Sequence, residues 1–384
     1  MRSARMLWPG ALLLVVAASA AGLDHAAQAF TRFFGPKAAV RVVRPTLLWE
    51  VWPGEGSQVT SATMALDGAG VPAAYDLGRR MLAYEPSSPL AYGPHHVNCL
   101  VTIDGHYTLH KEWDFRVPAG ALLALPEFTQ IDGQILGEVN AIRSDYGLPA
   151  FEFDPRLAAA ARAHSGYLSA NSTTGHFEQP GHPGFVGDSP GARLEAFGYV
   201  YDSWECVNFG TLDITESVRS LFDAPYHRIP FLQPGRLMIG GGCVDRRLTL
   251  EFEMTKLSGT VVSPHAGERD VPTQWSSWER PNPLRMHPGA KVVGYPIVFS
   301  RFSPRQSRLV VQEAGLWSSD GSQVPLYLNT AANDDRLTFT AFLIPQQALR
   351  ASTCYTAAVR AHTEDGEDVS GKWRFTTASA QPRR

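Results

Sequence analysis

Residues 139–164 read VNAIRSDYGLPAFEFDPRLAAAARAH, and this stretch decides the fold of the middle of the chain. It begins inside a helical pattern, in which apolar residues recur every three to four positions and stop before a glycine: Ile131, Ile135, Val139, Ile142 and then Gly147. A second helix is predicted from Asp154-Pro155, because an N-cap residue is followed there by a proline at the first helical position. We therefore expect two helices joined by a short loop.

Further helix signals and one strand signal follow in the same segment. Ser189-Pro190 predicts a third helix, and Asp213 stands three residues before Glu216, as in a capping box. Residues 248–254 alternate between apolar and polar side chains, which indicates a closing strand. The segment from about residue 127 to residue 256 is therefore predicted to be an α+β domain.

The regions before and after this segment share a degenerate repeat and contain β-strand signals. Asp67-Gly68 and Asp320-Gly321 are hairpin signals, since glycine adopts positive φ without strain. Each copy ends on a strand whose aromatic residues alternate and should point inward: Trp113 and Phe115 in the first, Trp373 and Phe375 in the second. We predict an immunoglobulin-like β-sandwich over residues 38–118 and another over residues 260–378.

The N-terminus and the overall charge indicate where the chain works. Arg2 and Arg5 precede a short apolar run and then Ala27-Gln28-Ala29, which predicts a secretory signal peptide over residues 1–29; an uncleaved anchor is the alternative. No later run reaches about 18 apolar residues, so we expect no transmembrane anchor in a mature, secreted (periplasmic or extracellular) chain. The formal net charge of -3, without a basic stripe, argues against a nucleic-acid partner.

Several motifs then occur in one order along the middle segment. The stretch over residues 139–164 is followed by Gly175-His176-Phe-Glu178, by Arg193 and Gly198-Tyr199, by Glu205, and by Ala224-Pro225-Tyr226-His227-Arg228. This ordered set resembles a bacterial CAP domain, whose superfamily is named after cysteine-rich secretory proteins, antigen 5 and pathogenesis-related proteins. The resemblance implies a central α-β-α sandwich domain over residues 127–256, flanked by the two all-β modules in a multidomain chain.

The resemblance also implies a surface cleft lined by two histidines and usually two acidic residues. By position, His176 and His227 correspond to the histidines. Glu205 corresponds to one acid, although Trp204-Glu205-Cys206 stands where the family has Gly-Glu-Asn. The second acid has no clear counterpart: Asp223 is nearest in register, and Glu178 or Glu216 are alternatives.

Three kinds of chemistry remain open for this set of residues. His176, His227 and Glu205 can bind Zn²⁺ through imidazole nitrogens and a carboxylate. A His–carboxylate pair can instead act as a general base on water, or can simply order the surrounding loops through hydrogen bonds. His164 lies on the apolar face of its helix and is interpreted as a core residue.

The four cysteines are divided between the predicted domains. Cys206 and Cys243 fall in the same predicted domain, so we predict a disulfide between them. Cys99 and Cys354 lie in strand-like runs of different modules and are expected to be buried free thiols.

We interpret the chain as a non-enzymatic secreted protein that binds a lipid or a cell-surface or cell-envelope partner through the cleft, with the β-sandwich modules as spacers. The alternatives are a metal- or His/Glu-assisted hydrolase of peptides or envelope polymers, and a structural surface component.

Overall fold

The computed structural model describes residues 29–210 and 213–379. The signal peptide predicted over residues 1–29 lies outside these ranges apart from its last residue. The chain forms two compact units. The described residues of the first unit are 29–127 and 155–202, and those of the second are 128–154, 203–210 and 213–379. Because each unit combines segments that are distant in sequence, this division does not test the predicted domain limits.

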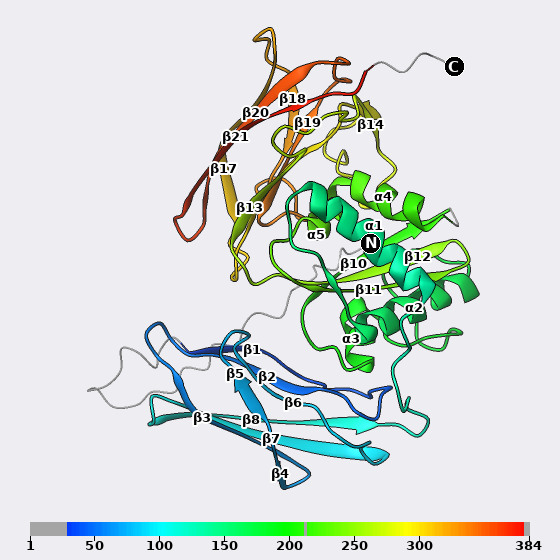
Figure 1. The fold of residues 1–384 in the computed structure, drawn as a ribbon, viewed down its shortest axis with the longest axis vertical. Coiled ribbons are helices and arrows are strands. Elements are labelled where there is room, and N and C mark those ends of the chain that lie inside the picture. The colour runs from blue at the N-terminus through cyan, green and yellow to red at the C-terminus, as the bar shows by residue number, and fades with distance from the viewer. Residues whose placement is uncertain (1–28, 211–212, 380–384) are drawn as a thin grey trace, which may run out of the picture. The chain divides into compact units, whose positions relative to one another are not determined.

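The first unit contains two four-stranded antiparallel sheets, ordered β1-β2-β6-β5 and β4-β3-β7-β8 (Figure 1). The strands are β1 (Phe30–Gly35), β2 (Leu47–Trp52), β3 (Val59–Leu66), β4 (Ala69–Val71), β5 (Ala74–Asp76), β6 (Met81–Tyr84), β7 (Gly93–Ile103) and β8 (Tyr107–Val117). Trp113 and Phe115 on β8 are buried in the core between these strands, as their alternation predicted. The first hairpin signal is confirmed, because Asp67 and Gly68 join the paired strands β3 and β4 with positive φ angles of 51° and 80°.

The first unit also contains α2 (Pro155–Ala170) and α3 (Pro190–Ala196). α2 begins at Pro155, as predicted, and buries an alanine-rich face from Leu157 to Ala161 together with His164. The N-cap of α3 is Ser189, whose hydroxyl accepts a hydrogen bond from the backbone N–H of Ala192 at 3.4 Å. The predicted start of the third helix is therefore confirmed.

The second unit contains a sheet ordered β10-β12-β11-β9 together with three helices. The strands are β9 (Glu152–Phe153), β10 (Ser203–Phe209), β11 (Met238–Val244) and β12 (Arg247–Glu253), and the helices are α1 (Gln130–Asp145), α4 (Ile214–Asp223) and α5 (Pro225–Phe231). Thr129 caps α1 in a reciprocal capping box with Asp132, and the Asp213 side chain caps α4 at the backbone N–H of Glu216. The apolar residues that predicted α1 pack against this sheet, since Ile135, Val139 and Ile142 share one core with Leu250 and Phe252.

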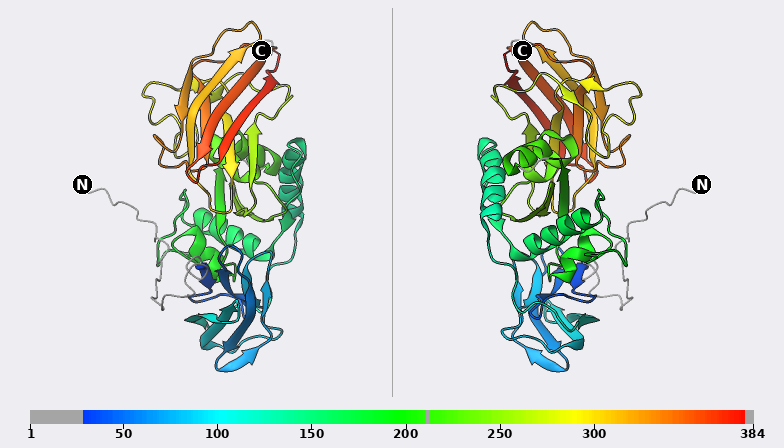
Figure 2. Two further views of the ribbon diagram at one scale, coloured as in Figure 1. Left: turned by 90° about the vertical axis from the view of Figure 1, so that its left-hand side faces the viewer. Right: turned by 90° about the vertical axis from the view of Figure 1, so that its right-hand side faces the viewer.

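The rest of the second unit is a β-rich C-terminal module, seen from two sides in Figure 2. Its sheets are ordered β13-β16-β19-β18, β17-β20-β21 and β14-β15. The strands are β13 (Gly259–Ser263), β14 (Trp275–Ser276), β15 (Val292–Val293), β16 (Ile297–Phe302), β17 (Leu309–Ser318), β18 (Leu326–Asn329), β19 (Thr340–Pro345), β20 (Cys354–Thr363) and β21 (Asp368–Thr376). Trp373 and Phe375 on β21 are buried, as predicted.

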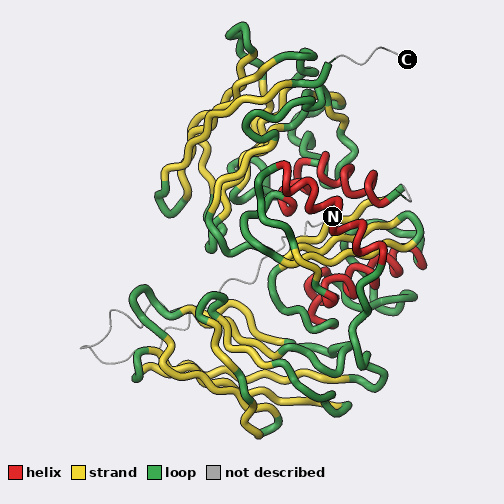
Figure 3. Tube along the Cα trace, viewed as in Figure 1, coloured by secondary structure: helices red, strands yellow, loops and turns green. Residues whose placement is uncertain are grey.

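The α5 helix takes part in the core of this C-terminal module. Tyr226 and Ile229 belong to the same buried cluster as Phe299 and Phe342, and the rings of Tyr226 and Phe342 lie 5.1 Å apart. Figure 3 draws the helices in red and the strands in yellow. In sequence, the helices lie between residues 130 and 231, and antiparallel strands lie before and after them. The predicted multidomain fold, helical in the middle and β-rich at both ends, is therefore confirmed. In the described ranges, no helix is long and apolar enough to cross a membrane.

Candidate functional site

The short helix α5 carries three consecutive residues of the motif singled out in the sequence: Tyr226, His227 and Arg228. Pro225 at its first turn fixes the backbone in a helical conformation. Successive residues of an α-helix point about 100° apart, so the three side chains leave the helix in different directions. Each of them meets a different part of the C-terminal module.

His227 contacts a carboxylate from the loop between β14 and β15. Its ring Nδ1 lies 2.6 Å from Oε1 of Glu279, and its backbone N–H donates to the same oxygen at 3.0 Å. The Glu279 side chain is fully buried, whereas the His227 side chain is 11% exposed. A carboxylate on one ring nitrogen orients an imidazole and leaves the other nitrogen available. Glu279 has no sequence signal, because no motif surrounds it and it lies 52 positions after His227.

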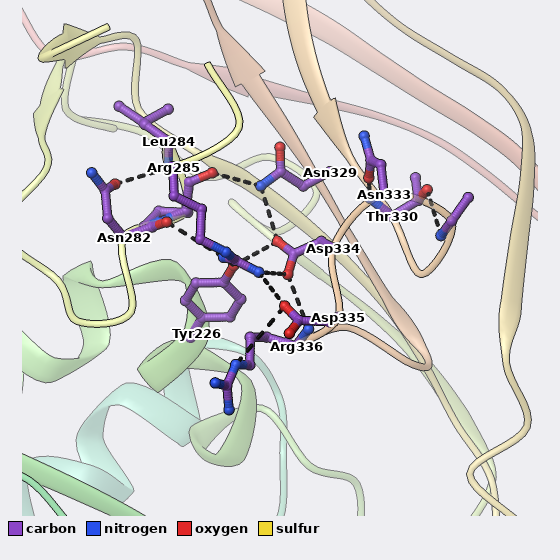
Figure 4. A network of polar contacts seen from close by, with 12 residues as sticks. Tyr226, Asn282, Leu284, Arg285, Asn329, Thr330, Asn333, Asp334, Asp335 and Arg336 are labelled. Carbon is purple, nitrogen blue, oxygen red and sulfur yellow. Dashed lines mark hydrogen bonds and ion pairs between the residues drawn. The ribbon is translucent and has the colours of Figure 1, made fainter. Parts of the chain in front are cut away.

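Tyr226 is anchored by a second set of polar contacts, drawn in Figure 4. Its hydroxyl donates to Oδ2 of Asp334 at 2.5 Å, and Asn329 Nδ2 donates to the same oxygen at 3.1 Å. The Arg285 guanidinium binds the other oxygen of Asp334 and also Asp335. Burial, together with the adjacent Asp334 carboxylate, holds the pKa of Tyr226 well above its usual value. The phenol therefore stays protonated and acts as a donor.

Arg228 and Asp223 close the junction between α4 and α5. The buried Arg228 guanidinium donates to the carbonyl oxygens of Phe222, Asp223 and Pro296 at 2.8 to 3.0 Å. Tyr295 donates its hydroxyl to Oδ1 of Asp223 at 2.9 Å. Asp223, the nearest candidate in register for the second cleft acid, thus has a phenol bound to its carboxylate.

Glu205 lies on β10, directly opposite Glu251 of β12 in the strand register, and both side chains are buried. Ser203 donates to Oε2 of Glu251 at 3.2 Å. Burial, followed by the charges of Glu279, Glu205 and Glu251, raises the pKa of the Cys206 thiol well above its usual value. The buried Cys206 thiol therefore stays protonated.

The predicted Cys206–Cys243 disulfide is wrong. All four cysteines lie in the described ranges and are free thiols. Cys206 is on β10 and Cys243 on β11, and β12 lies between these strands in the sheet. Two strand spacings of about 4.8 Å put the two Cα atoms at least about 10 Å apart, beyond the ~7 Å that a disulfide can bridge. The Cys206 thiol instead donates to the carbonyl oxygen of His227 at 3.8 Å.

In the first unit, Glu178 forms a buried cluster with His164. Its Oε1 lies 2.9 Å from Nδ1 of His164, and its Oε2 accepts from the backbone N–H of Val186 at 2.8 Å. The Arg193 guanidinium lies 3.6 Å from Oε1. These contacts confirm His164 as a core residue and give Glu178 the role of ordering the loop before α3.

His176 also belongs to the first unit, where its carbonyl oxygen accepts from Arg193 at 3.1 Å. Glu205 and His227 belong to the second unit. In the part of the chain that the structure describes, no three His, Cys, Asp or Glu side chains are grouped so as to hold a metal ion. The zinc set His176, Glu205 and His227 stays a prediction, which metal analysis of the purified protein would decide.

Comparison with protein-family models matches residues 136–247 to CAP, the cysteine-rich secretory protein family. The central segment is a CAP domain. The matched range contains the motif of α5 and Glu205, whereas Glu279 lies beyond the end of the CAP domain. The resemblance seen in the ordered motifs is therefore confirmed.

Three solved structures are similar to parts of this chain at low sequence identity. An extracellular protein with an SCP domain from Bacillus anthracis is 16% identical, with a TM-score of 0.29, over 58% of this chain and 88% of that one. An outer surface protein of Borrelia burgdorferi is 17% identical, with a TM-score of 0.29, over 35% and 98%. CopC from Methylosinus trichosporium is 15% identical, with a TM-score of 0.22, over 33% and 100%. A search of curated proteins gave no match.

Proposed function

We propose that this CAP-domain protein is exported and binds a lipid or cell-envelope ligand without turning it over, using the His227 imidazole as a recognition group. The observation that carries the proposal is the His227–Glu279 contact at 2.6 Å, which fixes the ring while 11% of the side chain stays exposed. A fixed imidazole binds a polar group with little loss of side-chain entropy. The His227 imidazole would therefore form a hydrogen bond with a polar group of the ligand.

The Cys206 thiol, which contacts His227, is not suited to covalent catalysis, and this favours recognition. The Cys206 thiol contacts the backbone carbonyl of His227, not its ring. Because burial and then the neighbouring carboxylates raise its pKa, this thiol is not ionised at neutral pH. The thiolate is the nucleophilic form of cysteine, so Cys206 is not a nucleophile here.

The ligand is tested by extracting full-length protein, purified under native conditions, with organic solvent and identifying bound lipid by mass spectrometry. Muropeptide binding is measured in parallel by calorimetry. We expect His227→Ala to weaken binding about tenfold, or about 1.4 kcal/mol, through loss of one polar contact. His362→Ala on β20 is the matched control and should bind as the unaltered protein does. Unchanged binding in His227→Ala would contradict the proposal.

The same contact favours a second candidate, a hydrolase in which Nε2 of His227 activates water. A carboxylate on Nδ1 orients a histidine for this role, and it would equally orient Nε2 as a metal ligand. Assays of peptide and peptidoglycan hydrolysis, with and without added Zn²⁺, separate the two functions. Hydrolysis that is lost in His227→Ala would favour the enzyme, whereas binding without hydrolysis favours recognition.

A further inference from the structure

The three motif residues of α5 are all bound by residues outside the CAP domain. Tyr226 donates to Asp334, His227 contacts Glu279, and Arg228 donates to the carbonyl oxygen of Pro296. These three partners lie beyond residue 247, where the match to the CAP family ends. The C-terminal module therefore positions α5, and it does more than extend the chain as a spacer.

Burying the Glu279 carboxylate in this position costs desolvation free energy. Its side chain is fully buried, and a buried carboxylate needs donors to offset the loss of water. Among the described residues, the hydrogen-bond contacts of Glu279 are both with His227, at its ring Nδ1 and at its backbone N–H. The second oxygen, Oε2, is buried without a hydrogen-bond partner in the same part of the chain. A leucine or glutamine would fill this space at lower cost, so packing does not explain the carboxylate.

Two of the acids considered from the sequence, Asp223 and Glu178, are engaged elsewhere. Asp223 accepts a hydrogen bond from Tyr295, and Glu178 accepts from the backbone N–H of Val186 while contacting His164. Neither one contacts the His227 ring among the described hydrogen bonds. Glu279 does, and it comes from a loop that follows the CAP domain in sequence.

We propose that Glu279 is the positioning residue of His227, a second acid that the C-terminal module supplies to the CAP domain. It holds the neutral ring as the Nδ1–H tautomer, so that the lone pair of Nε2 faces outward as an acceptor. We expect the 11% of the side chain that is exposed to be the ring edge away from Nδ1, since Nδ1 contacts a fully buried carboxylate. This role deepens the proposed function, because it defines which ring atom meets the ligand.

The tautomer is read by ¹⁵N NMR of full-length protein labelled at its histidine rings, at alkaline pH. His227→Gln identifies the signals of residue 227. We expect Nδ1 of His227 to carry the proton in the unaltered protein. Glu279→Leu should move the proton to Nε2, the form that free histidine favours. Glu279→Gln should keep it on Nδ1, since an amide oxygen still accepts.

Glu268→Gln is the matched control, because Glu268 accepts from Tyr146 at 3.0 Å in the same unit and does not bond to His227. It should leave the His227 signals unchanged. An Nε2–H tautomer in the unaltered protein, or an unchanged Nδ1–H tautomer in Glu279→Leu, would overturn the proposal. If Glu279→Leu fails to fold, the unaltered protein and Glu279→Gln still decide the tautomer. This readout needs no ligand, so it can succeed even if the proposed binding function fails.

Discussion

At the scale of single residues, burial decides which polar groups can act. Glu178 and His164 are both buried and satisfy each other, so they order a loop. His227 is held on one side by a buried carboxylate and is itself largely buried, with 11% of its side chain exposed. The sequence could identify His227 through its motif, but no local pattern could identify Glu279, because its role depends on a contact across 52 residues.

The cysteines provide a prediction at the residue scale. We expect four titratable thiols in protein unfolded without a reductant, because the structure holds all four cysteines as free thiols. In the folded protein, Cys99 should react very slowly, since burial raises its pKa to about 12. The measurement is a thiol titration with and without prior reduction. Two titratable thiols before reduction and four after it would show that a disulfide is present and would contradict this prediction.

At the scale of secondary-structure elements, local signals predicted most of the helices. The caps Ser189 and Asp213 and the proline at position 155 mark helix starts that the structure confirms for α2, α3 and α4. The residues of α5 were recognised as a sequence motif, but no helix was predicted there. It is seven residues long and carries Pro230, and its burial against the C-terminal module stabilises it more than its sequence does.

The anchoring of α5 can be tested at its first turn. We expect Tyr226→Phe to lower the free energy of unfolding by about 1–3 kcal/mol, because Asp334 would lose a donor in a buried site. The measurement is urea unfolding of the full-length protein.

Tyr327→Phe is the control for this prediction, since no described residue bonds to the hydroxyl of Tyr327, which lies in the same module. It should change the free energy of unfolding by less than about 0.5 kcal/mol. Equal effects of the two substitutions would show that the Tyr226 hydroxyl does not anchor α5.

At the scale of the whole molecule, the sequence predicted a helical middle between β-rich ends but not how its parts combine. The alternating aromatic residues of β8 and β21 were enough to predict buried strands. The joining of α5 to the C-terminal core, through Tyr226 and Ile229, had no sequence signal. A periodic pattern shows which face of an element is buried, but it does not show which partner covers that face.

The C-terminal module holds His227 of the CAP domain through Glu279. The most direct test is a double-mutant cycle of His227→Ala and Glu279→Ala, with the free energy of unfolding measured for the full-length protein and the three variants. We predict a coupling energy of at least about 1 kcal/mol, since the two residues bond in a buried site. Effects that add to within about 0.5 kcal/mol, as expected for residues that do not interact, would contradict the account.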